Sequence, residues 1–74
     1  MKIQTGKYRH YKGKDYEVIG LGRHSETLEE LVIYKALYYS KEYGNNAIWA
    51  RPKAMFFETV EVDGETKPRF EYTG

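Results

Sequence analysis

The stretch Leu31–Tyr38 constrains the fold most, because it is the longest apolar run in the chain. It is rich in β-branched and aromatic residues, whose side chains pack well on a pleated surface. We therefore predict a strand here, entered from a polar loop. The competing interpretation is a helix over 27–43, since Thr27 and Glu30 have the spacing of a capping box and Gly44 could end the helix.

Shorter segments on either side have the composition of further strands bounded by turn residues. Gly20 and Gly22 lie within one of them and predict a bulge or a sharp bend. Pro52 predicts the start of a single helical turn through Phe56, because proline suits the first helical position. The expected strands are 6–11, 16–21, 31–38, 47–51, 57–62 and 69–73.

Two loops carry recognisable turn chemistry. In the loop 39–46, the residues Gly44-Asn45-Asn46 tolerate left-handed backbone conformations. Asp63-Gly64 predicts a hairpin, although the polar residues 65–68 favour a loop longer than two residues. Both loops connect strands that we expect to be neighbours.

These elements predict a mainly-β fold, a small SH3-like antiparallel barrel of five or six short strands with one helical turn. The helix interpretation gives the alternative, an α+β fold in which one helix at 27–43 packs on a curled sheet. We expect residues 1–74 to form a single small domain, with 1–5 as a loose lead-in. The run Met55–Phe57 is expected to plug one end of the barrel.

Size and composition limit how such a fold is stabilised. The chain has 74 residues and no cysteine, so disulfides and thiolate metal sites are excluded. Eight tyrosines, three phenylalanines and one tryptophan supply the side chains for packing, and each such ring buries on the order of 150–250 Å². We expect no metal and no other cofactor.

Nothing in the sequence suggests a membrane protein. No apolar run approaches the roughly 20 residues that span a bilayer, and the first residues lack the apolar core of a signal peptide. A cytoplasmic location is expected.

Charge is balanced overall but unevenly spread. Residues 1–24 carry six Lys or Arg against two acids, a net +4, and residues 25–74 carry six against nine, a net −3. The first part could form a basic face, or it could pair with the acids of the second part. We favour pairing.

Several short motifs in a fixed order give a resemblance that covers Tyr8 to Tyr72. The chain resembles a family of short bacterial proteins catalogued as a domain of unknown function. The resemblance implies a bacterial, stand-alone, cytoplasmic domain and assigns no catalytic residue. The motifs are His10-Tyr11-Lys12-Gly13, Arg23-His24-Ser25-Glu26-Thr27, Val32-Ile33-Tyr34, Trp49-Ala50-Arg51-Pro52, Met55-Phe56 and Arg69-Phe70.

The favoured function is a non-enzymatic binding module. Trp49 and Arg51 share one face of a strand, and an arginine beside an indole can recognise a carboxylate, a phosphate or a base. The ligand would be a peptide, a nucleic acid or an anionic small molecule. The structural alternative makes Trp49 a core residue and pairs Arg51 with Glu26 or Glu58. The predicted site comprises Tyr11, Tyr34, Trp49, Arg51 and Arg69, with His24 and Glu26 at its rim.

A small hydrolase-like or metal-dependent enzyme is the alternative function, with His24 as general base and Glu26 as its partner or a metal ligand. Adjacent side chains rarely converge as a catalytic triad requires, and His10 and His24 follow no metal-binding spacing. Hydrogen bonds to loop backbone are the simpler expectation for the segment around Ser25. Self-association into a homodimer through tyrosine-rich faces is a further possibility.

Overall fold

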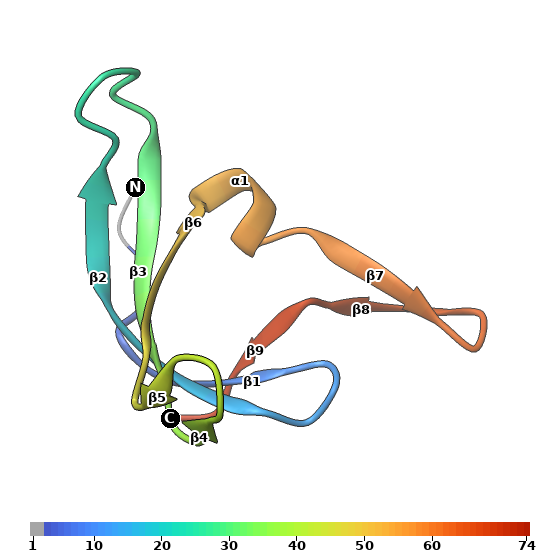
Figure 1. Cartoon of the computed structure of the whole chain (residues 1–74). Helices are drawn as coiled ribbons and strands as arrows, with labels where there is room; N and C mark the ends of the chain where they lie inside the picture. Colours follow the sequence, from blue (N-terminus) through green and yellow to red (C-terminus); the bar gives the residue numbers. More distant parts are fainter. Residues whose placement is uncertain (1–2) are drawn as a thin grey trace.

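The computed structural model describes residues 3–74, and Figure 1 shows how they are arranged. Their main unit is an antiparallel sheet with the strand order β6-β3-β2-β1-β9. Two short hairpins, β4-β5 and β7-β8, lie outside that sheet. The elements are β1 Gly6–His10, β2 Asp15–Arg23, β3 Glu30–Ala36, β4 Tyr39–Ser40, β5 Gly44–Asn45, β6 Ile48–Pro52, α1 Lys53–Phe56, β7 Thr59–Val62, β8 Glu65–Pro68 and β9 Phe70–Tyr72.

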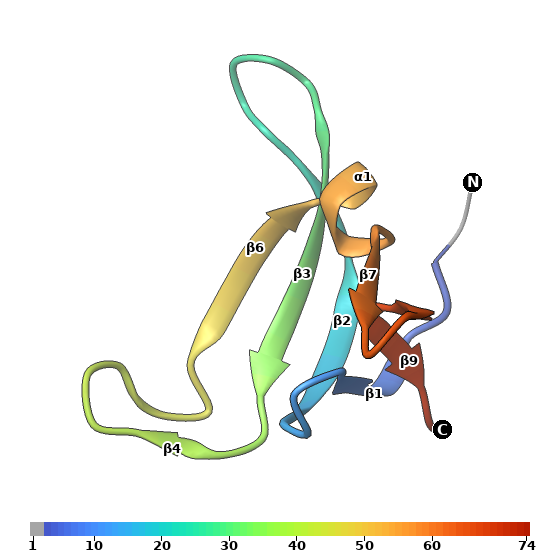
Figure 2. The same cartoon turned by 90° about the vertical axis from the view of Figure 1, so that its right-hand side faces the viewer.

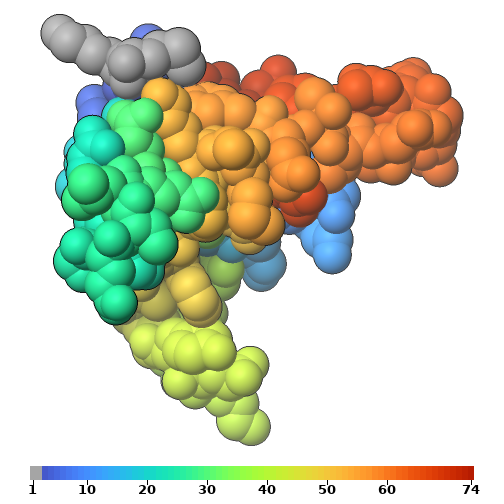
Figure 3. Space-filling model, turned by 90° about the horizontal axis from the view of Figure 1, so that it is seen from above, coloured from blue at the N-terminus to red at the C-terminus, as the bar shows by residue number. Residues whose placement is uncertain are grey.

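The mainly-β prediction is confirmed, but the sheets of residues 3–74 do not close into the expected barrel. Strands β6 and β9 remain the two edges of the main sheet, because β7 and β8 pair with each other instead of joining those edges. Figure 3 shows the β7-β8 hairpin (orange) and the β4-β5 hairpin (yellow-green) projecting from the body. A curled open sheet with a helix results, as in the alternative interpretation, although the helix lies at Lys53–Phe56 and not in 27–43.

Strand β3 covers the apolar run up to Ala36, so the strand interpretation is confirmed, although the strand ends two residues before the predicted Tyr38. Val32, Tyr34 and Ala36 are buried while the residues between them are partly exposed. That period of two belongs to a strand and not to a helix. Leu28 precedes the strand with a φ of 64°, which a right-handed helix does not allow.

The predicted irregularity of the second strand is a β-bulge, where the register of β2 with β3 shifts between Val18 and Gly20. Val18 and Leu21 are three residues apart, so in a regular strand they would face opposite sides. The extra residue turns both toward the core, where they pack together with the other buried side chains. Ile19 is left on the outside, 52% exposed.

The core consists mainly of rings on the inner face of the sheet. Phe56 of α1 is fully buried, and its ring stacks on Phe70 with centroids 4.3 Å apart. It also meets Tyr8 and Tyr34 edge-on at 5.5 and 5.6 Å. Of the expected plug, only Phe56 is buried, because its chain neighbours Met55 and Phe57 are exposed.

The turns explain two further differences from the sequence prediction. Val62 pairs with Glu65, and positive φ angles of 51° at Asp63 and 79° at Gly64 close a two-residue turn. The expectation of a longer loop there is wrong, because the polar residues 65–68 form β8 on a hairpin exposed to solvent. The loop 39–46 contains the small β4-β5 pair and takes the predicted left-handed conformation at Gly44 and Asn46.

The expected lead-in falls partly outside the described residues, which begin at Ile3. Residues 3–5 have no regular secondary structure, yet Ile3 packs against the core and the Gln4 carbonyl accepts the Tyr8 hydroxyl at 2.8 Å. None of the helical segments in residues 3–74 has the length and apolar character that crossing a bilayer requires.

Candidate functional site

A cavity of about 210 Å³ lies on the inner face of the sheet, where one arginine stands among aromatic rings. Strand pairing builds it: Tyr34 on β3 is the register partner of Trp49 on β6, and cross-strand partners share a face. Arg51 follows Trp49 by two residues and so faces the same side. The lining side chains are Tyr16, Tyr34, Tyr38, Trp49 and Arg51.

Arg51 is held by rings and not by a carboxylate. Its Nε donates to the Tyr34 hydroxyl at 3.4 Å, and its Cζ lies 5.8 Å from the centre of the Phe70 ring. The ion pairs of residues 3–74 all use other cations, so neither Glu26 nor Glu58 is the partner of Arg51. The guanidinium thus enters the cavity without a counter-charge from the described residues.

The Tyr16 wall of the cavity is a neutral phenol. The hydroxyls of Tyr16 and Tyr38 lie 2.7 Å apart and share a hydrogen bond. Burial raises the pKa of the Tyr16 phenol, and the hydrogen bond with Tyr38 raises it further. Tyr16 therefore carries no negative charge at neutral pH that could compensate Arg51.

His10 lies beside the cavity, near several cations. The His10 ring lies 4.9 Å from Phe70 and 6.4 Å from Tyr16 between ring centres. Burial lowers the pKa of His10, and the nearby positive charges, first that of Arg69 and then that of Arg51, lower it further. The cations Arg69, Arg51 and Lys12 therefore lie close enough to His10 to disfavour its protonated form.

Arg69 reaches this cluster with an incomplete set of partners. Its Nη2 is 4.0 Å from a carboxylate oxygen of Glu58, the outer limit of an ion pair. Its Nε is buried and has no hydrogen-bond partner among residues 3–74, which is uncommon for a buried donor. Arg69 is thus weakly neutralised by the protein.

Tyr11 lies beside the cavity and not inside it. Its ring is 4.6 Å from the His10 ring, and it lines a neighbouring hollow of about 150 Å³ with His10, Lys67 and Pro68. The Lys12 ammonium lies 5.8 Å from the Tyr11 ring centre, and the Lys14 ammonium lies 4.9 Å from that of Tyr38. Both contacts are within the range of cation–π attraction.

His24 and Glu26 lie apart from the cavity, in the exposed loop between β2 and β3. Figures 1 and 2 show this loop at the opposite end of the sheet from the β4-β5 hairpin, which is next to Tyr38 in the chain. The His24 Nδ1 accepts the amides of Glu26 at 3.1 Å and Thr27 at 3.3 Å. The side chain thus holds the loop backbone in shape. In the described part of the chain, no three His, Asp or Glu side chains are placed to hold a metal ion.

The structure therefore brings together Tyr34, Trp49 and Arg51 of the predicted site and places Arg69 nearby. Sequence reasoning missed Tyr16 and Tyr38. The alternation along the second strand already put Tyr16 on the same face as Val18, so its place could have been inferred. Tyr38 follows β3, and only the folded chain brings it against Tyr16.

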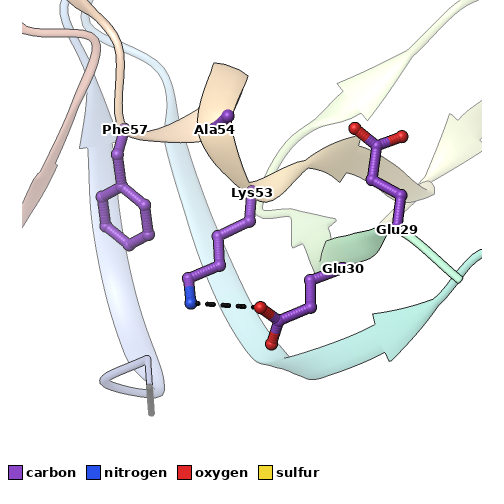
Figure 4. A pocket seen from close by; sticks show the side chains of 5 residues that line it. All are labelled: Glu29, Glu30, Lys53, Ala54 and Phe57. Carbon is purple, nitrogen blue, oxygen red and sulfur yellow. Dashed lines mark hydrogen bonds and ion pairs between the residues drawn. The ribbon is translucent and has the colours of Figure 1, made fainter.

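A larger cavity, about 410 Å³, lies between α1 and the start of β3 and is shown in Figure 4. Lys53 pairs there with Glu30 at 3.5 Å, and Phe57 and Ala54 supply apolar walls. Because its cation already has an acidic partner inside the cavity, this site offers less unmet charge than the Arg51 cavity.

Fold and site together define a small mainly-β domain with an arginine and ring-lined cavity on the inner face of a curled sheet. The chain belongs to the family described as "Protein of unknown function (DUF1653)", whose family model matches residues 6–72. The crystal structure of a DUF1653 protein from Bordetella bronchiseptica is similar, with a TM-score of 0.87 and 38% identity. The alignment covers 97% of this chain and 88% of that one. No curated protein shows significant similarity to the chain.

Proposed function

We propose that the domain is a non-enzymatic binding module that recognises an anionic ligand through the Arg51 cavity. The observation that supports this most is a guanidinium among four aromatic rings, without a carboxylate partner in residues 3–74. Arg51 is partly buried, and the cost of removing a charge from water is offset when a counter-charge is present. A ligand anion would supply the missing partner.

The chemistry of the walls narrows the ligand. A guanidinium presents a planar fork of donors that fits a carboxylate or phosphate in a bidentate manner. The rings provide flat apolar surfaces on which a planar group can stack. The cavity, about 210 Å³, is below the ~300–1,000 Å³ of pockets for drug-sized ligands. It suits a single anionic group joined to one ring.

Trp49 reports on the site directly, because it is the only tryptophan of the chain and lines the cavity. We expect phenyl phosphate and benzoate to change its fluorescence in a saturable way at pH 7, and neutral benzyl alcohol to have little effect. R51Q should weaken phenyl phosphate binding at least about tenfold, since hydrogen bonds to charged groups contribute ~1.5–3 kcal/mol. The affinity of R51K for phenyl phosphate should fall between those of R51Q and the unchanged protein, because lysine keeps the positive charge but lacks the bidentate donors of the guanidinium.

R23Q is the matched control, because it also removes one arginine charge. Arg23 donates to the Leu28 carbonyl at 2.8 Å, in the loop away from the cavity. Its variant should bind phenyl phosphate as the unchanged protein does. Equal affinity of R51Q and the unchanged protein, with both folded by circular dichroism, would refute the proposal. The alternative enzyme that uses His24 and Glu26 stays a prediction, and the geometry of their loop adds no observation in its favour.

A further inference from the structure

Rings and cations lie close together between the Arg51 cavity and the turn between β1 and β2. We call this group the aromatic-basic band. Its members are Arg51, Tyr16, Tyr38, Lys14, Tyr11 and Lys12.

Ring and cation contacts link the members of the band, with His10 between Tyr16 and Tyr11. Within the cavity, the ring centres of Tyr16 and Tyr38 are 5.5 Å apart, and Lys14 covers Tyr38. In the other direction, His10 joins Tyr16 to Tyr11, whose ring Lys12 approaches. Two places in the band therefore set a lysine against a ring, Lys14 at Tyr38 and Lys12 at Tyr11, and an extended ligand could meet both.

No ion pair within residues 3–74 involves Lys12, Lys14 or Arg51 of the band. Among the ion pairs of residues 3–74, none joins a cation of the first 24 residues to an acid of the remainder. Arg9 pairs with Asp15 in its own segment, and Glu17 pairs with Lys35. The expectation that the basic first part would pair with the acidic second part therefore fails for the described residues. Lys12 and Lys14 stay available at the turn.

This arrangement favours single-stranded nucleic acid over an acidic peptide. Every nucleotide carries both a flat ring and a phosphate, so a repeated ring-and-cation pattern matches it at each step. An acidic peptide would use the cations but leave most of the rings without a stacking partner. A duplex keeps its bases stacked inside, where a cavity on the inner face of a curled sheet cannot reach them.

We propose that the aromatic-basic band binds single-stranded nucleic acid, with one base in the Arg51 cavity and phosphates along Lys12 and Lys14. This inference rests on the proposed function and names its ligand class. RNA and DNA share the chemistry that the band reads, and the test below compares them.

The experiment titrates the protein with uridine monophosphate, the octanucleotides U8 and dT8, and an octaglutamate peptide, with Trp49 fluorescence as the readout. U8 or dT8 should bind at least about tenfold more tightly than the mononucleotide. Their affinity should fall with salt, with a slope of about −0.7 in log K against log salt for each phosphate contacted. K12Q/K14Q should reduce that slope by about 1.4, for two lost contacts.

The matched control is K7Q/K35Q, which removes the same charge from the outer face. Lys7 and Lys35 are both register partners of Glu17, so they face away from the cavity. This control should keep the salt slope of the unchanged protein, and an equal loss in both double variants would overturn the inference.

The remaining outcomes separate the two proposals. The mononucleotide could bind as tightly as both octanucleotides and still lose affinity in R51Q. That result would overturn the nucleic-acid inference and leave the proposed function intact. Tighter binding of octaglutamate would overturn it in favour of an acidic peptide. Failure of all these ligands and of phenyl phosphate would overturn both proposals.

Discussion

Replacing Phe56 with alanine should remove a large part of the stability of the domain. The side chain is fully buried between Phe70, at 4.3 Å, and the edges of Tyr8 and Tyr34. A ring that buries about 150–250 Å² at ~25 cal/mol per Å² contributes about 4–6 kcal/mol. A compact unfolded state lowers this by about 10–40%, which leaves about 2–5 kcal/mol. That range overlaps the ~3–5 kcal/mol that Phe→Ala usually costs in a core.

That loss is large relative to the total. At about 0.05–0.15 kcal/mol per residue, a domain of this length has a free energy of unfolding of about 4–11 kcal/mol. Urea unfolding followed by Trp49 fluorescence and circular dichroism gives the change directly. The Phe70 ring contacts both the Phe56 ring and the Arg51 guanidinium. The milder F56L should therefore also weaken phenyl phosphate binding while the protein stays folded.

The neighbouring residue supplies the control, since Phe57 is 45% exposed. F57A should cost less than about 1 kcal/mol, because exposed positions contribute little. The core assignment is refuted if F57A costs as much as F56A, or if F56A costs less than about 1.5 kcal/mol against the ~3–5 expected.

Three further predictions follow from single contacts. Y38F should lower the free energy of unfolding by about 0.5–1.5 kcal/mol and lower the pKa of Tyr16 toward its ordinary value, because the 2.7 Å hydrogen bond between the two hydroxyls is lost. An alkaline titration, followed by tyrosinate absorbance, that is the same in the variant and the unchanged protein would contradict this. The pKa of His10 is lowered by burial and by nearby cations, so the unfolded chain binds a proton at His10 more readily than the folded chain. The contribution of His10 to stability is therefore complete above about pH 6.5 and is lost as the pH falls below that value. H10Q should flatten the decline of the unfolding free energy between pH 7 and 5 in urea unfolding, and an unchanged decline would exclude His10 as its origin. G64A should cost about 1–2 kcal/mol because φ is 79° at that position, whereas G20A, whose added methyl meets no atom within 4 Å, should cost less; equal losses in thermal unfolding would show that the turn geometry does not decide the effect.

The elements that the sequence predicted correctly are those that depend on near neighbours in the chain. The β-branched residues of Leu31–Tyr38 predicted a strand, and the glycines near residue 20 predicted the bulge. Pro52 predicted the helical turn that begins after it. Each depends on backbone sterics or on side-chain alternation, which act over a few residues.

The site was only partly predictable for a related reason. Trp49 and Arg51 are two residues apart in one strand, so their common face could be read from the sequence. The sequence could not show that His24 and Glu26 lie away from Trp49 and Arg51, because that depends on which end of a hairpin lies next to the cavity. Tyr38 joins the site through a contact with Tyr16 that spans 22 positions in the chain.

The sequence by itself determined a mainly-β domain that packs around aromatic rings, because cysteine is absent and apolar residues alternate along short segments. The tertiary structure alone decided that the sheet stays open and that Arg51 faces rings without an acidic partner in residues 3–74. The physical reason is that strand pairing between distant segments sets which charges meet, and a few residues of local sequence do not encode that pairing.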